Sequence, residues 1–562
     1  MAPPVRYKPA PGPDDFRVLR EGGYHYVDKT GFIVEWLARP DQVVLLPRPR
    51  RFGKSLNLST LRYFLDKGAE DLSGLFDGLA VRAVPAAWSE MGRYPVIFLS
   101  LKDTRARSWS GCLEAIRAQL ARAAATHPAL QDSPRLSAAD QGLWRRLTAR
   151  EATPAECEGA LLALSGWLHA HHDAPVVLLI DEYDAPIEAG YEHGWYDEVI
   201  AFMRNLLGGV LKSNPHLFRG VLTGVRRISK ESLFSGVNNV RVHSLLDPPF
   251  SSAFGFTEAE VAEVLAAAGR QEAVDAVRDW YNGYDFGGQV IYNPWSVLSF
   301  AQDGVIKEYW ASTSSEELLR QLIPSNRAGL RGPFERLLQG DAVEAELDEH
   351  VVLRDLEQNP AAIWSFLLTA GYLKASEVRW VEGRARAKVS IPNREVLGVW
   401  RRQFSQWLTL GLGGSAPDVE ALIAALMAGD ARLVQRLLRV LVQNTLSVHD
   451  TGAGPGDPER VYQAFVLGLL VWLEPRWRVR SNRESGYGRA DVLILPTERG
   501  RPGVVLEIKR LWSDEGETPE AALADAQAQI RDRGYAAEVE AAGASVVRQF
   551  AVVFSGKSVW VA

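Results

Sequence analysis

Residues 48–55 read Arg-Pro-Arg-Arg-Phe-Gly-Lys-Ser and combine residue types that can hold the phosphates of a nucleotide. They follow an apolar run at residues 43–46 and precede a helical pattern at residues 56–65. In a P-loop, backbone N–H groups at a helix N-terminus surround phosphate, a lysine reaches the β and γ oxygens, and a hydroxyl binds Mg²⁺. The pattern predicts a nucleotide-binding loop with Ser55 as a metal ligand, formed by Arg51, Phe52, Gly53, Lys54, Ser55 and Leu56.

The loop departs from the usual P-loop pattern at one position. That pattern has a glycine five residues before Gly53, and this chain has Arg48 there. Taken alone, the stretch could also be a basic loop in front of an ordinary helix. Assigning it to nucleotide binding therefore requires supporting residues elsewhere in the chain.

A second group of candidate residues follows the apolar stretch at residues 176–180. Five consecutive apolar residues are typical of a strand buried on both faces of a parallel sheet. Asp181 and Glu182 come directly after it, at the sheet edge where α/β folds bind ligands. We expect Asp181 to hold Mg²⁺ through water and Glu182 to polarise the attacking water as a catalytic residue. The alternative is that the two carboxylates only end a strand and cap a helix.

A further strand is predicted at residues 218–224, and its polar tip could sense the γ-phosphate. Thr223 lies at that tip and is a candidate nucleotide-binding residue. Arg226 and Arg227 follow it and are candidates for an arginine finger or sensor that neutralises transition-state charge, in cis or across a subunit interface. The same basic residues would also suit a solvated surface.

The segment at residues 26–29 is a candidate for contact with an adenine base. In nucleotide-binding folds, the segment before the first strand often packs near the base. A turn that caps the following helix is the alternative.

Residues near the C-terminus carry a separate set of groups suited to phosphodiester chemistry. Glu507 and Lys509 lie two apart in a strand pattern, so their side chains should share one face. Across a hairpin, Asp491 can meet Glu507. Two carboxylates there would bind Mg²⁺, while Lys509 would orient water and steady the developing charge. A strand with surface ion pairs is the alternative.

The composition is that of a globular protein with several domains. The chain has 562 residues, of which 47% are hydrophobic and 23% charged, and about 100–200 residues per domain indicates three or four domains. A formal net charge of −6 argues against a general polyanion binder, so nucleic acid would need a local basic surface. Cys112 and Cys157 are too few for a disulfide framework or a cysteine-rich metal site.

Targeting signals are not apparent in the sequence. The N-terminus lacks the apolar segment of a secretory signal, and no apolar run approaches the roughly 20 residues that span a bilayer. We therefore expect a soluble, cytoplasmic protein with no membrane partner.

Several motifs in combination make the chain similar to a known bacterial family. They resemble AAA-ATPase-like proteins that carry a C-terminal PD-(D/E)XK nuclease-type domain, and the likeness spans nearly the whole chain. The resemblance implies that Arg48 is compatible with nucleotide binding, because this form of the loop is usual in that family. The motifs are Tyr-Val-Asp-Lys-Thr at 26–30, the loop at 48–56, Ile-Asp-Glu-Tyr-Asp at 180–184, Leu-Phe-Ser-Gly-Val-Asn-Asn at 233–239, Tyr-Asn-Gly-Tyr at 281–284, Tyr-Asn-Pro-Trp-Ser at 292–296 and Tyr-Trp at 309–310.

For the C-terminal part, the resemblance implies the Asp…Glu-x-Lys signature of these nucleases at Asp491, Glu507 and Lys509. It also implies two supporting candidates. Glu459 would supply the helix carboxylate of related nucleases, and Gln529 would lie near the active face in the family's Gln-Ile pair.

Together, the patterns and the resemblance predict an α/β protein in four parts. Buried strands alternating with helices suit a parallel sheet in the first part. The predicted parts are an AAA-like P-loop ATPase domain at residues 1–255, a helical lid at 256–330, a helical and winged-helix-like connector at 331–450, and an α/β restriction-endonuclease-like domain at 451–562.

The first functional hypothesis is a protein that hydrolyses ATP and couples nucleotide state to Mg²⁺-dependent cleavage of nucleic acid. DNA is the expected substrate, ATP and Mg²⁺ are the expected cofactors, and a homo-oligomer is compatible with the chemistry. The second is a nucleotide-dependent switch or scaffold whose nuclease fold binds nucleic acid or a partner without cleaving it. A third, a structural ATPase of cell regulation, suits the negative net charge.

Overall fold

The chain forms two compact units in the computed structural model, and each is described by itself. Unit one comprises Met1–Ser314 and Ala342–Val396, and unit two comprises Ser315–Asp341 and Leu397–Ala562. Of residues 481–485 and 488–491, only the backbone is described. The described residues are 9–68, 70–226, 239–310, 331–338, 340–348, 359–411, 416–445, 466, 470, 473, 476–485, 488–511, 516–532 and 534–562.

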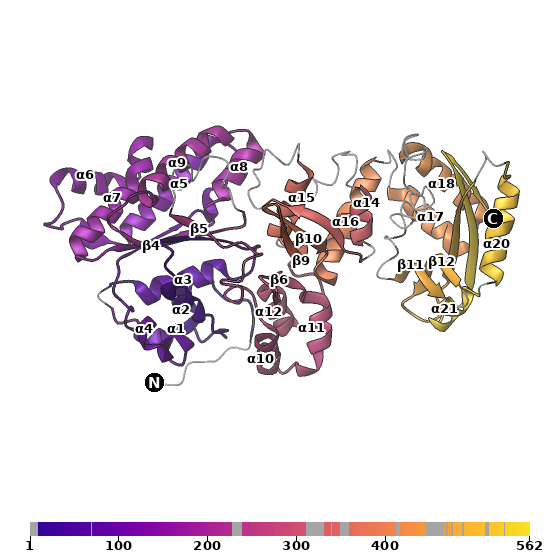
Figure 1. Ribbon diagram of the computed structural model, residues 1–562, viewed down its shortest axis with the longest axis horizontal. Helices are drawn as coiled ribbons and strands as arrows, with labels where there is room; N and C mark the ends of the chain where they lie inside the picture. Colours follow the sequence, from indigo (N-terminus) through magenta and orange to yellow (C-terminus); the bar gives the residue numbers. More distant parts are fainter. Residues whose placement is uncertain are drawn as a thin grey trace. The chain divides into compact units, whose positions relative to one another are not determined.

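A parallel sheet of five strands lies at the centre of unit one (Figure 1). Its strand order is β2-β3-β4-β1-β5, and every neighbouring pair is parallel. β1 and β3 are buried along their whole length, because apolar side chains point to both faces. This confirms the predicted parallel sheet. The strands are β1 (Val43–Pro47), β2 (Val96–Ser100), β3 (Val176–Asp181), β4 (Leu217–Gly224) and β5 (Val240–Val242).

Helices cover both faces of this sheet. α1 to α4 lie on one side and α5 to α9 on the other (Figure 1). α7 starts at a capping box, in which Thr153 and Glu156 each satisfy a backbone N–H of the other. The helices are α1 (Phe16–Glu21), α2 (Gly31–Ala38), α3 (Lys54–Leu65), α4 (Pro85–Trp88), α5 (Trp109–Ala125), α6 (Ala138–Thr148), α7 (Pro154–His172), α8 (Ala185–His193) and α9 (Tyr196–Leu211). The 3₁₀ helices here are η1 (Ser73–Phe76), η2 (Ala80–Ala83), η3 (Lys102–Thr104) and η4 (Pro128–Leu130).

A smaller helical layer follows the sheet in the sequence. Thr257 and Glu260 form a capping box that starts α10. Aromatic side chains such as Tyr281, Tyr292 and Phe300 fill the core between these helices. The elements are α10 (Glu258–Ala268), η5 (Gln271–Ala273), α11 (Val274–Tyr281), the antiparallel pair β6 (Tyr284–Phe286) and β7 (Gln289–Ile291), and α12 (Pro294–Asp303).

A three-stranded antiparallel sheet completes unit one. Its order is β8-β10-β9, and α15 packs against β8. β10 alternates exposed and buried residues, because one face is covered and the other meets solvent. The elements are β8 (Val343–Leu347), α15 (Pro360–Thr369), β9 (Lys374–Val381) and β10 (Arg384–Ser390); α16 (Arg394–Gly411) begins after them and continues into unit two.

Unit two is built on a mixed sheet of order β11-β12-β13-β14-β15. β13 and β14 are parallel, with α20 and α21 between them in the sequence, and the other pairs are antiparallel. Besides part of α16, the elements are α14 (Arg331–Leu338), α17 (Ala416–Ala428), α18 (Ala431–Thr445), β11 (Trp477–Ser485), β12 (Gly488–Pro496), β13 (Gly503–Arg510), α20 (Pro519–Asp532), α21 (Ala536–Ala541), β14 (Val547–Ser555) and β15 (Ser558–Val561).

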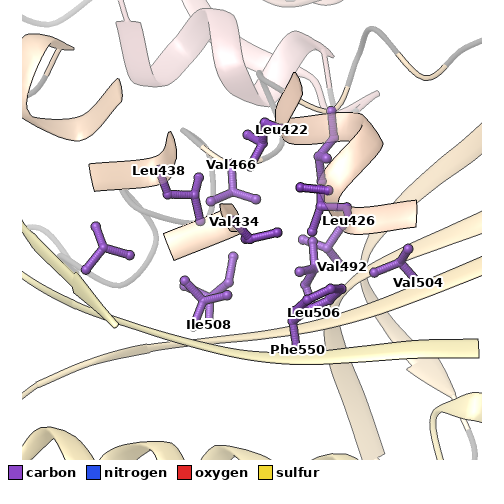
Figure 2. Close-up of a cluster of buried hydrophobic side chains, with 14 of the residues drawn as sticks. Leu422, Leu426, Val434, Leu438, Val466, Val492, Val504, Leu506, Ile508 and Phe550 are labelled. Carbon is purple, nitrogen blue, oxygen red and sulfur yellow. The ribbon is translucent and has the colours of Figure 1, made fainter. Parts of the chain in front are cut away.

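The two faces of this sheet pack against different helices. On one face, Val492, Leu506 and Ile508 meet side chains of α17 and α18, such as Leu426 and Val434 (Figure 2). On the other face, alternate residues of the same strands pack against α20 and α21. Glu507 and Lys509 are the alternate residues of β13, so they belong to the α20 face.

Among the helices of the described residues, none combines the length and apolar content that a bilayer-crossing helix needs.

The core between α18 and the sheet provides a matched stability test. Val434 is fully buried there, whereas Val440 on the same helix is 42% exposed. We expect Val434→Ala to destabilise unit two by about 2 kcal/mol, because it removes buried methyl groups and leaves a cavity. Val440→Ala should cost much less. Urea dependence of hydrogen exchange at β13 and β14 measures both, and equal losses would contradict this packing.

Candidate functional site

The loop between β1 and α3 has the backbone geometry of a phosphate-binding turn. Gly53 adopts a φ of 82°, in the left-handed region, and α3 begins at the next residue. Any other residue would be strained in this conformation. The turn leaves the first N–H groups of α3 available for an anion at the helix N-terminus.

Lys54, the first residue of α3, folds back onto the loop. Its Nζ donates to the carbonyl oxygens of Arg48 at 3.0 Å and Pro49 at 2.9 Å. The side chain is buried, and burial lowers the pKa of Lys54, while the nearby charges of Glu182 and Asp181 act in the opposite direction. The ammonium group therefore lies within the loop, close to two carboxylates.

Asp181 links three elements through its carboxylate. Its Oδ2 accepts a hydrogen bond from Ser55 Oγ at 2.6 Å, and its Oδ1 accepts one from Thr223 Oγ1 at 2.7 Å. Asp181 is 2% exposed and ends β3, whereas its partners come from α3 and β4. The structure thus brings these three predicted site residues together. Their oxygen atoms are the type of ligand that Mg²⁺ prefers.

Glu182 follows Asp181 in an unusual backbone conformation. Its φ is 50°, which costs about 1–3 kcal/mol for a residue other than glycine. Burial raises the pKa of Glu182, and the Lys54 charge partly offsets this. Such a strained carboxylate beside a ligand cavity is a common arrangement at functional sites.

A cavity of about 430 Å³ opens beside these residues, within the range of small-molecule sites. Lys54, Ser55 and Glu182 line its polar part. The remaining wall includes apolar and aromatic side chains next to further basic groups. These are Tyr26, Val27, Phe256, Trp295 and Leu298, together with Lys29, Arg50, Arg51, Lys102 and Arg105.

Arg48 occupies the position where the usual pattern has glycine, and it points into the protein core. It is fully buried, and its Nη1 donates to the carbonyl oxygens of Pro47 at 2.8 Å and His243 at 2.9 Å. Its guanidinium lies over the rings of Phe254 and Phe286. Burial lowers the pKa of Arg48 to about 10. Because the Arg48 side chain points inward, it does not cover the phosphate-facing side of the loop.

Residues far along the chain pack against the phosphate-binding loop. The sequence motifs alone do not predict these contacts. Trp310 Nε1 donates to the Arg50 carbonyl at 3.2 Å. Phe52 packs against Tyr284 of β6, with ring centroids 4.9 Å apart. The aromatic and glycine-rich motif at 281–284 was the available signal, and its Tyr284 is buried in this packing.

A buried carboxylate at the start of α16 fixes the segment that carries Trp310. Glu395 Oε1 accepts hydrogen bonds from the backbone N–H groups of Tyr309 and Trp310, each at 2.6 Å, and Oε2 accepts one from Ser296 Oγ at 2.8 Å. Glu395 is fully buried, and burial raises its pKa to about 7 despite these bonds.

Of the two arginine candidates after β4, the structure describes Arg226 alone. Arg226 is buried, its Nη1 lies 3.2 Å from Glu188 Oε1, and its guanidinium lies 3.9 Å from the centre of the Phe366 ring. It does not line the cavity. Arg227 lies outside the described residues.

The C-terminal candidates lie along β12, β13 and α20 of unit two. Val492 pairs with Leu506, and Asp491 and Glu507 are the residues next to this pair on β12 and β13. Glu507 is 4% exposed. Lys509 Nζ forms an ion pair with Asp525 of α20, and Gln529 Nε2 donates to the same carboxylate at 3.3 Å.

Glu459 lies outside the described residues. Asp525 is a partner that sequence reasoning missed, although its position four residues before Gln529 places both on one helix face.

These features define a class of protein. A loop of the P-loop type, a carboxylate two strands away in the same parallel sheet and a cavity beside the loop characterise a nucleotide-binding α/β unit. A mixed sheet with Glu-x-Lys on a central strand characterises the second unit.

Comparisons with known proteins agree with both parts. A family model described as a predicted AAA-ATPase (AAA-ATPase-like) matches residues 11–234, and one for the PD-(D/E)XK nuclease superfamily matches residues 457–562. The chain is 32% identical over 390 residues to the "uncharacterized protein in vnfD 5′ region" of Azotobacter chroococcum mcd 1, which covers 68% of this chain and 67% of that protein. The chain belongs to the AAA-ATPase-like family with a C-terminal PD-(D/E)XK nuclease-superfamily domain.

The raised pKa of Glu395 predicts a pH dependence of stability. Its ordinary value is 4.5 and the folded value is about 7, so the folded state binds this proton more tightly. The resulting stabilisation is complete below pH 4.5 and is lost as the pH rises through 7, by about 3 kcal/mol in total.

The isosteric variant Glu395→Gln has no such proton. We expect the melting temperature of the wild type to fall more between pH 5 and pH 8 than that of Glu395→Gln. Parallel pH dependence in the two proteins would contradict the burial of an ionisable Glu395.

Proposed function

We propose that this protein binds and hydrolyses ATP in unit one, and that its C-terminal domain cleaves phosphodiesters of nucleic acid, with DNA as the expected substrate. The observation that carries the ATPase proposal is the meeting of Lys54, Ser55, Asp181 and Thr223 beside a cavity that Glu182 also lines. Positioning and charge stabilisation are the main requirements of phosphoryl transfer, and these residues suit both.

Each residue has a distinct role in the proposed hydrolysis. The N–H groups at the start of α3 bind the phosphates, and Lys54 turns from the loop carbonyls to their oxygens. Ser55 and Asp181 offer a hydroxyl and a carboxylate to Mg²⁺, which supplies charge neutralisation at the phosphates when bound. Glu182 orients the attacking water, and its raised pKa suits a group that takes part in proton transfer. Thr223 donates a hydrogen bond to Asp181 Oδ1, the oxygen that Ser55 does not contact, and senses the γ-phosphate.

The apolar end of the cavity suits the nucleobase. Tyr26, Val27 and Phe256 line it, in accord with the expected role of residues 26–29. We propose that α10, α11 and α12 form a lid over this end, because Trp295 and Leu298 of α12 also line the cavity.

The proposal keeps the four-part division of the chain. α15 and the sheet β8-β10-β9 form the winged-helix-like connector. The boundaries proposed from the sequence are 255/256, 330/331 and 450/451. A homo-oligomer is also part of the proposal, because the ATPase site lies at the surface and could accept a residue from a neighbouring copy.

In the C-terminal domain, the proposed nuclease site comprises Asp491, Glu507 and Lys509. Asp491 and Glu507 lie next to the paired residues Val492 and Leu506, and their carboxylates would hold Mg²⁺, which supplies the activation of water when bound. Lys509 stabilises the charge that develops on the phosphate. Asp525 and Gln529 position Lys509 from α20, and Glu459 is proposed as a supporting carboxylate.

The alternative function is a nucleotide-dependent switch or scaffold whose nuclease-like domain binds nucleic acid or a partner without cleaving it. The ion pair between Lys509 and Asp525 is the observation that favours this alternative, because it gives Lys509 a structural role. Cleavage of plasmid by the purified protein separates the two functions.

The lysine of the loop provides the test of ATP hydrolysis. We expect Lys54→Ala to lower kcat for ATP by about a hundredfold or more, because it removes the charge that stabilises the transferred phosphate. The control is Lys67→Ala, which removes an exposed lysine that donates to the His172 carbonyl. Phosphate release measures both. Equal activity of Lys54→Ala and wild type would refute the assignment of this loop.

A second variant tests cleavage apart from ATP hydrolysis. We expect Lys509→Ala to lower Mg²⁺-dependent cleavage of supercoiled plasmid by about a hundredfold or more and to leave ATP hydrolysis intact. The control is Lys557→Ala, in the exposed turn between β14 and β15. Cleavage by Lys509→Ala at the wild-type rate would exclude this nuclease site, and a wild type that binds plasmid without cutting it would support the scaffold.

A further inference from the structure

Three arginines surround one buried carboxylate at the edge of the cavity in unit one. Glu188 of α8 is 3% exposed, and its carboxylate lies 3.2 Å from both Arg50 Nη2 and Arg226 Nη1. Arg105 Nη2 forms an ion pair with the same carboxylate. The charges of Asp184, Glu182 and Glu192 also act on Arg105, so the cluster combines three guanidinium groups with several carboxylates.

A second buried carboxylate, Asp184, lies beside this cluster and binds the backbone that carries Arg226. Asp184 accepts hydrogen bonds from the backbone N–H groups of Val225 and Arg226, each at 2.9 Å. Burial and the neighbouring Glu188 raise the pKa of Asp184 to about 6. Burial alone would raise the pKa of Glu188, but the charges of Arg226, Arg105 and Arg50 outweigh burial and lower it. Glu188 is therefore the ionised partner of the arginines at neutral pH.

The three arginines differ in what else they contact. Arg226 is only 13% exposed, packs on Phe366 and does not line the cavity. The side chains of Arg50 and Arg105 are 31% and 35% exposed, and both line the cavity. Arg50 is part of the phosphate loop itself, so Arg105 is the cation of this cluster that reaches the cavity from another element.

Arg105 enters from the sheet edge where the reaction would take place. It follows η3, which comes directly after β2. β2 lies beside β3, with Ser100 opposite Asp181, so the segment after β2 leaves the sheet beside Glu182. Glu182 and Arg105 line the same cavity. The phosphate attacked by a water held at Glu182 is the terminal one, so this is the phosphate within reach of Arg105.

We propose that Arg105, held in place by Glu188, contacts the terminal phosphate of the bound nucleoside triphosphate and makes the site distinguish ATP from ADP. This inference rests on the proposed nucleotide binding in unit one. The contact forms within one chain, and it assigns to Arg105 the role that the sequence suggested for Arg226 or Arg227. Glu188 acts as a positioning residue, because it fixes Arg105 without facing the ligand.

Nucleotide binding by purified full-length protein tests the inference. Fluorescent ATP and ADP analogues are titrated with Mg²⁺ into wild type, Arg105→Ala and Arg105→Lys. The matched control is Arg93→Ala, which removes an arginine that pairs with Glu90 away from the cavity. We expect Arg105→Ala to raise Kd for the ATP analogue about tenfold or more, as loss of a charge-assisted hydrogen bond would. Its Kd for the ADP analogue should change by less than about threefold.

Arg105→Lys keeps the charge but loses the planar fork, so we expect an intermediate loss that is again specific to ATP. This variant carries the test if Arg105→Ala does not fold. Equal weakening of both nucleotides, or no weakening, would overturn the role of Arg105 and leave the proposed ATPase standing. A wild type that binds neither nucleotide would overturn the ATPase proposal and this inference together.

Discussion

The carboxylate of Asp181 is the interaction on which the site in unit one depends. It receives one hydrogen bond from Ser55 on α3 and another from Thr223 on β4, and it ends β3. Residues that are 126 and 42 positions apart in the sequence are thereby fixed within hydrogen-bond distance. The parallel sheet makes this meeting possible, because the carboxyl ends of β3 and β4 lie side by side at one edge.

Around this point the protein buries several charges, and each has a different set of partners. Arg48 lies under the loop with carbonyl oxygens and aromatic faces as partners. Glu395 receives two backbone N–H groups and a hydroxyl. Glu188 forms ion pairs with three arginines. Burying such groups is unfavourable unless they are paired, so these contacts specify one conformation of the loop. Trp310 joins the Glu395 contacts to the loop, because its backbone bonds Glu395 and its ring bonds the Arg50 carbonyl.

Much of this could be predicted from the sequence, and the reasons are physical. The runs before Gly53 and Asp181 are apolar without alternation, which indicates strands buried on both faces, and the parallel sheet follows. The spacing of Glu507 and Lys509 sets them on one sheet face, because side chains of a strand alternate. The glycine-lysine-serine motif locates the start of α3 because the left-handed turn at Gly53 requires glycine.

The remaining features depend on tertiary contacts that no local pattern encodes. Glu188 and Arg105 are 83 residues apart, and Trp310 meets the loop across 260 residues. The inward direction of Arg48 follows from the space between Phe254 and Phe286, which the sequence of the loop does not reveal. Asp525 pairs with Lys509 because α20 packs against β13, a tertiary contact between separate elements.

We propose two chemical sites in one chain, one for ATP and one for nucleic acid, and a single experiment can examine this arrangement. It is tested most directly by following both products in a single reaction of the wild-type protein with ATP, Mg²⁺ and supercoiled plasmid. We expect release of inorganic phosphate together with nicked or linear plasmid, and the loss of both when EDTA removes the metal. Intact plasmid and no released phosphate in the presence of Mg²⁺ would contradict it.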